Sequence, residues 1–186
     1  MSLFEYLMVM VAIVLGLSVT QLLRGLSKIA RGHQPFLPLI AWVVALFYMH
    51  IQVWWGFWDF SMVDEWTQFG FTFIIVIPCM LFAATELLVP LGSGPETNWR
   101  EHFISVRVWF YAVLTTFGVV ALLASRVMLD VPLNHPYRVV QTLATLSVAA
   151  GLFLRKPEAH TWICLVYLGV LITGQVLFRL FPGLGG

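Results

Sequence analysis

The sequence has few charged side chains for its length. Of its 186 residues, 10 are Lys or Arg and 9 are Asp or Glu, so the chain is 10% charged and 60% hydrophobic. Its mean hydropathy is +0.91. A soluble domain usually carries about 25% charged residues. So few charges cannot cover a globule of this size with polar surface, and we expect most of the chain to face lipid. The net charge of +1 gives no indication of a nucleic-acid partner.

Cysteine is also scarce, with only Cys79 and Cys164 present. Each lies inside an apolar run, and at a rise of about 1.5 Å per residue their expected depths in a membrane differ by roughly 10 Å. A disulfide joins Cα atoms that lie about 4.4–6.8 Å apart. We therefore predict two free thiols that pack as small hydrophobic side chains.

Short catalytic and cofactor-binding motifs are absent from the sequence. It contains no glycine-rich phosphate loop, GxSxG, HExxH or CxxC, so no catalytic residue or cofactor is assigned and an enzyme is the less favoured class. No basic segment precedes the first apolar run, which is therefore expected to stay as a span rather than to be cleaved as a signal peptide. An acidic rim does occur, but its spacing matches no metal site. It comprises Glu5, Asp59, Asp64, Glu65 and Asp130, with His135.

The chain does contain a series of long apolar runs. A helix needs about 20 mostly apolar residues to cross a bilayer. Pro35 and Pro38 suit a helix start before the second run, Pro78 should kink the third, and a PGLGG tail closes the last. The predicted fold class is all-α, a single transmembrane domain built as a compact bundle of about six helices. The runs cover approximately residues 3–26, 36–60, 69–91, 103–128, 137–154 and 162–181.

The distribution of Lys and Arg predicts the orientation. Because cytoplasmic loops are enriched in these residues, we expect the first, third and fifth connections to lie in the cytoplasm and both termini outside it, in a bacterial-type inner membrane. These connections and the helix ends beside them hold seven of the ten basic residues: Arg24, Lys28, Arg31, Arg100, Arg107, Arg155 and Lys156. The tryptophans are then expected near the two membrane surfaces, with Trp54, Trp55, Trp58 and Trp66 outside and Trp42, Trp99, Trp109 and Trp162 inside.

The first run carries small residues at a spacing of four, namely Ala12, Gly16 and Thr20. This spacing places them on one helix face and lets another helix approach closely, which favours helix association in lipid. We predict that this small-residue row is a packing surface, within the bundle or between molecules. The row becomes polar at its end, where Gln21 and Arg24 follow.

His50 is the most conspicuous ionisable residue. It lies 14 residues into the second run, about 21 Å along the helix and close to the middle of the membrane. Ionisable groups at that depth usually face the bundle interior and mark candidate functional sites, and histidine can carry a proton near neutral pH. The alternative is a neutral histidine that is hydrogen-bonded to a carbonyl or hydroxyl group across a helix interface. Haem ligation is disfavoured, because the other histidines lie at span ends or in loops.

Glu86 is the carboxylate inside a span on the cytoplasmic half, at a depth similar to Arg24 and Arg107. Convergence of one acid and two bases there would bind or gate a charged solute. The alternatives are an ion pair that ties helices together, or arginines whose charged groups extend to the surface.

Three classes of function follow from these residues. The first is a channel or transporter for a proton, an ion or a small solute, with a path lined by Thr20, Gln21, Arg24, His50, Glu86 and Arg107. The second is a non-catalytic subunit or sensor that binds another membrane protein or a second copy of itself through the small-residue row. The third is a redox or quinone-binding protein, supported only by the aromatic residues near His50. Membrane lipid is an expected partner in each case.

Overall fold

The computed structural model describes residues 2–31, 35–63, 65–94, 96–132 and 134–177. This part of the chain holds helices and no strand, so the predicted all-α class is confirmed. The elements, in order, are α1 (Leu3–Arg31), α2 (Leu37–Gly56), the 3-10 helix η1 (Phe57–Met62), α3 (Gln68–Leu88), α4 (Trp99–Met128), α5 (Pro136–Ala150) and α6 (Pro157–Gln175).

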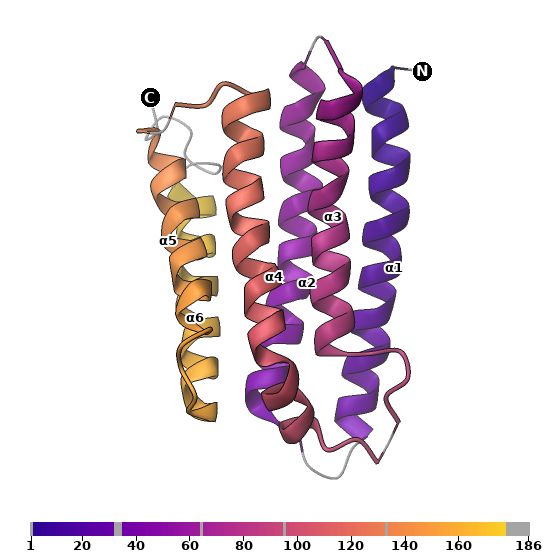
Figure 1. Cartoon of the computed structure of the whole chain (residues 1–186), viewed down its shortest axis with the longest axis vertical. Helices are drawn as coiled ribbons and strands as arrows, with labels where there is room; N and C mark the ends of the chain where they lie inside the picture. Colours follow the sequence, from indigo (N-terminus) through magenta and orange to yellow (C-terminus); the bar gives the residue numbers. More distant parts are fainter. Residues whose placement is uncertain (1, 32–34, 64, 95, 133, 178–186) are drawn as a thin grey trace.

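The six α-helices of the described residues alternate in direction (Figure 1). The contacts between neighbouring helices close them into a ring. Helix α3 packs between α1 and α4, α5 connects α4 to α6, and α2 packs against both α6 and α1. Helix α1 begins and α6 ends at the same end of the bundle. We call it the acidic end, because Glu5, Asp59, Glu65 and Asp130 lie there. The opposite, basic end carries Lys28, Arg31, Arg100, Arg155 and Lys156.

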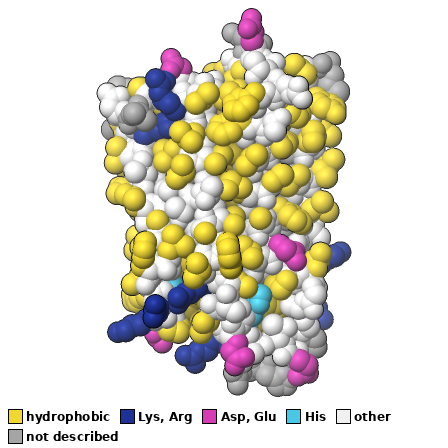
Figure 2. All heavy atoms as spheres, viewed as in Figure 1, with side chains coloured by type: hydrophobic (Ala, Val, Ile, Leu, Met, Phe, Trp, Pro, Cys, Tyr) yellow, Lys and Arg dark blue, Asp and Glu magenta, His cyan; other side chains and the backbone are white. Residues whose placement is uncertain are grey.

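Four helical segments are long and apolar enough to cross a membrane, so the chain is a multi-pass membrane protein. They are Leu3–Arg31, Leu37–Met62, Gln68–Leu88 and Trp99–Met128. Large apolar side chains cover their outer faces, as in Ile13 and Leu17 of α1, which are both 59% exposed. Figure 2 shows charged side chains gathered mostly toward the two ends of one face, with an apolar band between them.

Helices α5 and α6 are shorter, with 15 and 19 residues. Among the described residues neither meets the same criterion of length and hydropathy. Helix α5 ends before the predicted 154 because the chain turns after Gly151. Helix α6 begins before the predicted 162 because Pro157 suits the first helical turn. Residues 178–181 of the sixth predicted span, and the PGLGG tail, lie outside the described residues.

Local capping explains other differences in helix bounds. Helix α4 begins at Trp99 rather than near 103, since the Asn98 side chain accepts a hydrogen bond from the Glu101 backbone N–H. Thr67 caps α3 in the same way, with its hydroxyl oxygen 3.0 Å from the Gly70 nitrogen. Helix α3 continues through the buried Pro78.

An aromatic cluster fills the core in the basic half of the bundle. It consists of Trp42 from α2, Phe103, Phe110 and Tyr111 from α4, and His160 and Tyr167 from α6. The Tyr111 hydroxyl lies 3.0 Å from His160 Nδ1. Trp42 and Trp99 are buried in the bundle, whereas Trp109 and Trp162 are each 69% exposed. The depth of these tryptophans relative to the membrane surface stays a prediction. Both cysteines are free, as predicted, but only Cys164 is buried, whereas Cys79 is exposed.

Candidate functional site

The interface of α1, α2 and α3 contains a chain of hydrogen bonds centred on His50. Its Nε2 atom lies 2.6 Å from Ser18 Oγ, and its Nδ1 atom lies 2.7 Å from the Leu46 carbonyl oxygen. Ser18 Oγ lies 2.9 Å from Thr85 Oγ1. A carbonyl oxygen only accepts hydrogen bonds, so in the neutral ring Nδ1 carries the proton. Nε2 then accepts from the Ser18 hydroxyl, and the Thr85 hydroxyl donates to Ser18.

Gln21 and Glu86 continue this polar interface toward the basic end. The Gln21 amide donates to Glu86 Oε2 and, at 2.9 Å, to the Val89 carbonyl oxygen. Glu86 Oε1 accepts from the Leu91 backbone N–H at 3.4 Å. We call Ser18, Gln21, His50, Thr85 and Glu86 the polar seam. All of its side chains are buried except that of Glu86, which is half-buried.

The seam brings together some of the predicted path residues and leaves others apart. Gln21, His50 and Glu86 belong to it, but Thr20 and Arg24 are exposed on α1. Arg107 lies on α4, beyond α3, one turn before Tyr111 of the aromatic cluster. Within the described ranges no ion pair joins Glu86 to either arginine. The geometry of His50 is that of a histidine hydrogen-bonded across a helix interface, and proton passage along the seam stays a prediction.

The small-residue row lies on the outer face of α1. Gly16 and Thr20 are exposed, and no described side chain lies within 4 Å of the position that a Gly16 Cβ atom would take. The Thr20 hydroxyl donates to the Gly16 carbonyl oxygen of its own helix at 2.8 Å. Gly16 and Thr20 therefore lie on an open part of the helix surface, whereas Ala12 is half-buried, and a contact between molecules stays a prediction. The close helix contacts are made by other glycines, such as Gly25 and Gly118.

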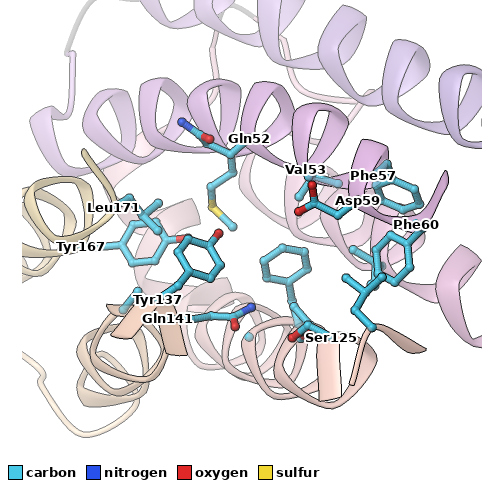
Figure 3. A pocket seen from close by; sticks show the side chains of 18 residues that line it. Gln52, Val53, Phe57, Asp59, Phe60, Ser125, Tyr137, Gln141, Tyr167 and Leu171 are labelled. Atoms are coloured by element: carbon cyan, nitrogen blue, oxygen red, sulfur yellow. Dashed lines mark hydrogen bonds between the residues drawn. The ribbon is translucent and has the colours of Figure 1, made fainter. Parts of the chain in front are cut away.

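A partly open cavity of about 170 Å³ lies on the other side of α2, lined chiefly by α2, η1, α4, α5 and α6. It belongs to the acidic half, since residues of η1, the end of α4 and the start of α5 line it. In Figure 3 the side chains of Asp59, Tyr137 and Gln141 project into the space between the helices. Toward the basic end the lining stops at Met49 and Tyr167. Tyr167 belongs to the aromatic cluster, which therefore closes the cavity on that side.

The cavity wall is mostly apolar and carries a few polar groups. Among the polar side chains, Ser125 donates to its own helix at Ala121 O, whereas Gln141 Oε1 is buried and has no hydrogen-bond partner in the described structure. A buried acceptor without a donor costs roughly 1–3 kcal/mol. This oxygen is inaccessible even though Gln141 belongs to the cavity lining, so the unpaired acceptor lies in the packing between the helices rather than at the cavity surface.

None of the predicted path residues lines this cavity. Sequence reasoning missed Gln52, Tyr137 and Gln141, and it assigned Asp59 only to the acidic rim. The signal that would have found Gln52 and Gln141 is an uncharged amide inside a predicted span, because such groups are costly in lipid and tend to face the protein interior.

Comparison of the chain with models of known protein families, with curated proteins and with solved structures gives no match.

Proposed function

We propose that the protein binds a small, largely apolar solute in the cavity of the acidic half and passes it across the membrane. The cavity itself carries this proposal. Ligand sites are concave, mostly apolar and provided with a few polar groups, and in bundles they lie between helices. An apolar cavity of about 150 Å³ holds benzene, so 170 Å³ suits a solute of one ring with a short substituent.

Passage through this site requires all four surrounding helices to lie in the membrane. Helices α5 and α6 run beside α4 and α2 (Figure 1), and we infer that they cross with them, giving six spans. The 15 residues of α5 correspond to about 22 Å, which is less than the bilayer core of about 30 Å. A short span of this kind is accommodated by local thinning of the bilayer.

The arrangement around the cavity suits access from one side at a time. The aromatic cluster separates the cavity from the basic end, so the solute enters from the acidic end in this state. The polar seam ties α1, α2 and α3 together, because a buried network whose members are paired is rigid. Movement of α4, α5 and α6 against that unit would open the other side, in the manner of alternating access.

The test uses three probes that share one ring and differ in charge: benzylammonium, benzyl alcohol and benzoate. At least one should stabilise the purified protein in detergent, by about 1–3 kcal/mol at a tenfold to hundredfold excess over its Kd. Ala121→Phe fills the cavity and should abolish this effect, whereas Val119→Phe, on the lipid side of α4, should preserve it. The probe that binds should also enter proteoliposomes faster with wild-type protein than with Ala121→Phe.

Two results would contradict the proposal. If none of the three probes stabilised the protein, the cavity would not be a binding site for solutes of this kind. If a probe bound but its flux were the same in wild-type and Ala121→Phe liposomes, the protein would bind the solute without transporting it.

A second function, a subunit that binds another membrane protein or a second copy of the chain, is favoured by the open face of α1. No described atom lies within 4 Å of the position that a Cβ atom on Gly16 would take. The Thr20 hydroxyl donates its hydrogen bond to the Gly16 carbonyl oxygen of the same helix. At Gly16 and Thr20 themselves, a helix from another molecule would find no side chain larger than threonine and no unpaired donor. The variant Gly16→Leu tests this contact through the fraction of associated molecules in lipid.

A further inference from the structure

A second cavity, which we call the basic-end groove, lies where α2, α4 and α6 begin (Figure 1). Its volume is about 550 Å³, within the usual range of about 300–1,000 Å³ for ligand sites. We propose that it holds the headgroup of a zwitterionic membrane phospholipid with a primary amine, a phosphatidylethanolamine. This site is separate from the solute cavity, and it shares with the proposed function only the inference that α6 crosses the membrane.

The groove extends from the end of the bundle along the first two turns of α6. The residues of α6 that line it are Pro157, Glu158, Thr161, Trp162 and Leu165. The eight residue steps from the first to the last correspond to about 12 Å along the helix. The headgroup layer of a bilayer is about 5–8 Å thick on each side. With α6 as a span, the groove therefore covers both this layer and the adjoining part of the hydrocarbon core.

Large apolar side chains in the groove are exposed. Leu37 of α2 is 64% exposed, and Trp162 and Leu165 of α6 are 69% and 50% exposed. Tryptophan is typical of the headgroup level, because one part of its ring system is apolar and the other carries an N–H donor. An acyl chain that descends from the headgroup would cover Leu165, which lies farthest from the start of α6. A water-soluble ligand would leave these side chains uncovered.

The start of α4 provides hydrogen-bond donors for a phosphate group. The Arg100 side chain lines the groove, and in the described part of the chain it makes no ion pair or hydrogen bond. A guanidinium group can bind two phosphate oxygens through parallel N–H···O bonds. Asn98 also lines the groove. Its Oδ1 atom accepts from the Glu101 backbone N–H, so its NH₂ group remains available as a donor.

The first turn of α6 provides the acceptor for an ammonium group. Glu158 is exposed, lines the same groove and has no partner among the described residues. A primary ammonium has three N–H donors, which this carboxylate can accept, whereas the trimethylammonium of choline has none. One base and one acid line the groove, Arg100 and Glu158. A headgroup with one negative and one positive charge complements both, whereas an anionic headgroup would meet the carboxylate without an ammonium group.

The charges next to the groove do not change this balance. Glu96 and Glu101 flank Arg100 in the sequence, Arg155 and Lys156 precede α6, and none of the four lines the groove. Exposed charges are screened by salt over about 10 Å. The two charged groups that line the groove therefore decide which headgroup it prefers.

The test titrates the purified protein in detergent micelles with three dioleoyl lipids: phosphatidylethanolamine, phosphatidylcholine and phosphatidylglycerol. Native mass spectrometry counts the lipids that bind. Phosphatidylethanolamine should bind about tenfold more tightly than the other two, as expected for a charge-assisted hydrogen bond. Glu158→Gln should abolish its preference over phosphatidylcholine. Arg100→Gln should weaken the binding of both lipids about tenfold, because both carry a phosphate group.

Glu101→Gln and Arg155→Gln are the matched controls, because each removes a charge of the same sign nearby and neither side chain lines the groove. They should leave the lipid affinities unchanged. Both test variants should unfold at the wild-type temperature without added lipid, since the replaced side chains are exposed and unpaired in the described structure. Phosphoethanolamine, which has no acyl chains, should bind at least about a hundredfold more weakly than the lipid because its apolar contacts are lost.

Four results would overturn the lipid site. They are equal binding of the three lipids, tighter binding of phosphatidylglycerol, a Glu158→Gln variant with wild-type preference, and binding of phosphoethanolamine as tight as that of the lipid. Ala121→Phe separates this proposal from the proposed function, because it fills the other cavity and should leave lipid binding unchanged. Failure of the lipid test would leave solute binding intact, and failure of the solute test would leave the lipid site intact.

Discussion

At the scale of single residues, Ser18 connects three helices through one hydroxyl group. It lies 2.6 Å from His50 Nε2 and 2.9 Å from Thr85 Oγ1, and it is fully buried. A hydroxyl group has one proton and two lone pairs, so Ser18 donates to the histidine while it accepts from the threonine. His50 uses Ser18 as a hydrogen-bond donor and Thr85 uses it as an acceptor, so replacing Ser18 affects both residues.

Ser18→Ala should lower the free energy of unfolding more than Thr85→Val does. The alanine leaves both His50 Nε2 and the Thr85 hydroxyl without their partner, whereas the valine leaves Ser18 bound to His50. An interhelical hydrogen bond in a membrane bundle contributes about 0.6 kcal/mol on average and up to about 1.7. We therefore expect a loss of about 1–2 kcal/mol for Ser18→Ala and under about 1 kcal/mol for Thr85→Val. Unfolding in mixed micelles would measure both, and a reversed order would contradict the assigned donor directions.

At the scale of helices, glycines decide how closely α1 approaches its neighbours. A methyl group on Gly25 would overlap the side chain of Val89, which is buried and follows α3. A methyl group on Gly16, on the same helix, would meet no described atom within 4 Å. Two glycines of one helix therefore serve different purposes, one inside the molecule and one on its outer face.

Gly25→Ala should destabilise the protein by about 1–3 kcal/mol, the usual cost of overpacking a close contact. Gly16→Leu should leave the unfolding temperature nearly unchanged but reduce association between molecules, measured by energy transfer in liposomes. Wild-type stability of Gly25→Ala would argue against the close packing of α1 on Val89. If Gly16→Leu associates as the wild type does, the outer face of α1 is not a contact surface.

At the scale of the whole molecule, the two ends of the bundle differ in charge. The basic end gathers the last turn of α1, the first turn of α4 and the connection between α5 and α6. Enrichment of Lys and Arg is typical of the cytoplasmic side, so we infer that this end is cytoplasmic. With the six spans proposed above, both termini would then lie outside the cytoplasm.

Reporter fusions test this orientation. An alkaline phosphatase fused after Gly186 should be active, since that enzyme folds only outside the cytoplasm, and a cytoplasmic reporter at the same position should be inactive. Fusions after Lys156, between α5 and α6, should give the opposite pair of results. Activity of the cytoplasmic reporter after Gly186 would mean a reversed orientation or an odd number of spans.

The sequence by itself determined the class of the protein and the approximate extent of most helices. These properties are local, because apolar length and the capping residues at each end act within one segment. The position of His50 inside the second helix followed in the same way. Helix α5 was predicted too long because the apolar residues after Ala150 gave no sign of the turn at Gly151.

Only the tertiary structure decided which side of each helix faces inward. In a soluble protein the contrast between polar and apolar faces gives this rotation, but lipid is as apolar as a protein core, so the contrast is weak in a membrane helix. The sequence therefore did not indicate that Trp42 is buried, that Ser18 meets His50, or that Gln141 and Asp59 face one cavity. Arg24 and Arg107 were expected to converge because they share a depth, yet the ring order places α3 between their helices. Depth is a property of one segment, whereas neighbourhood depends on how all the segments pack together.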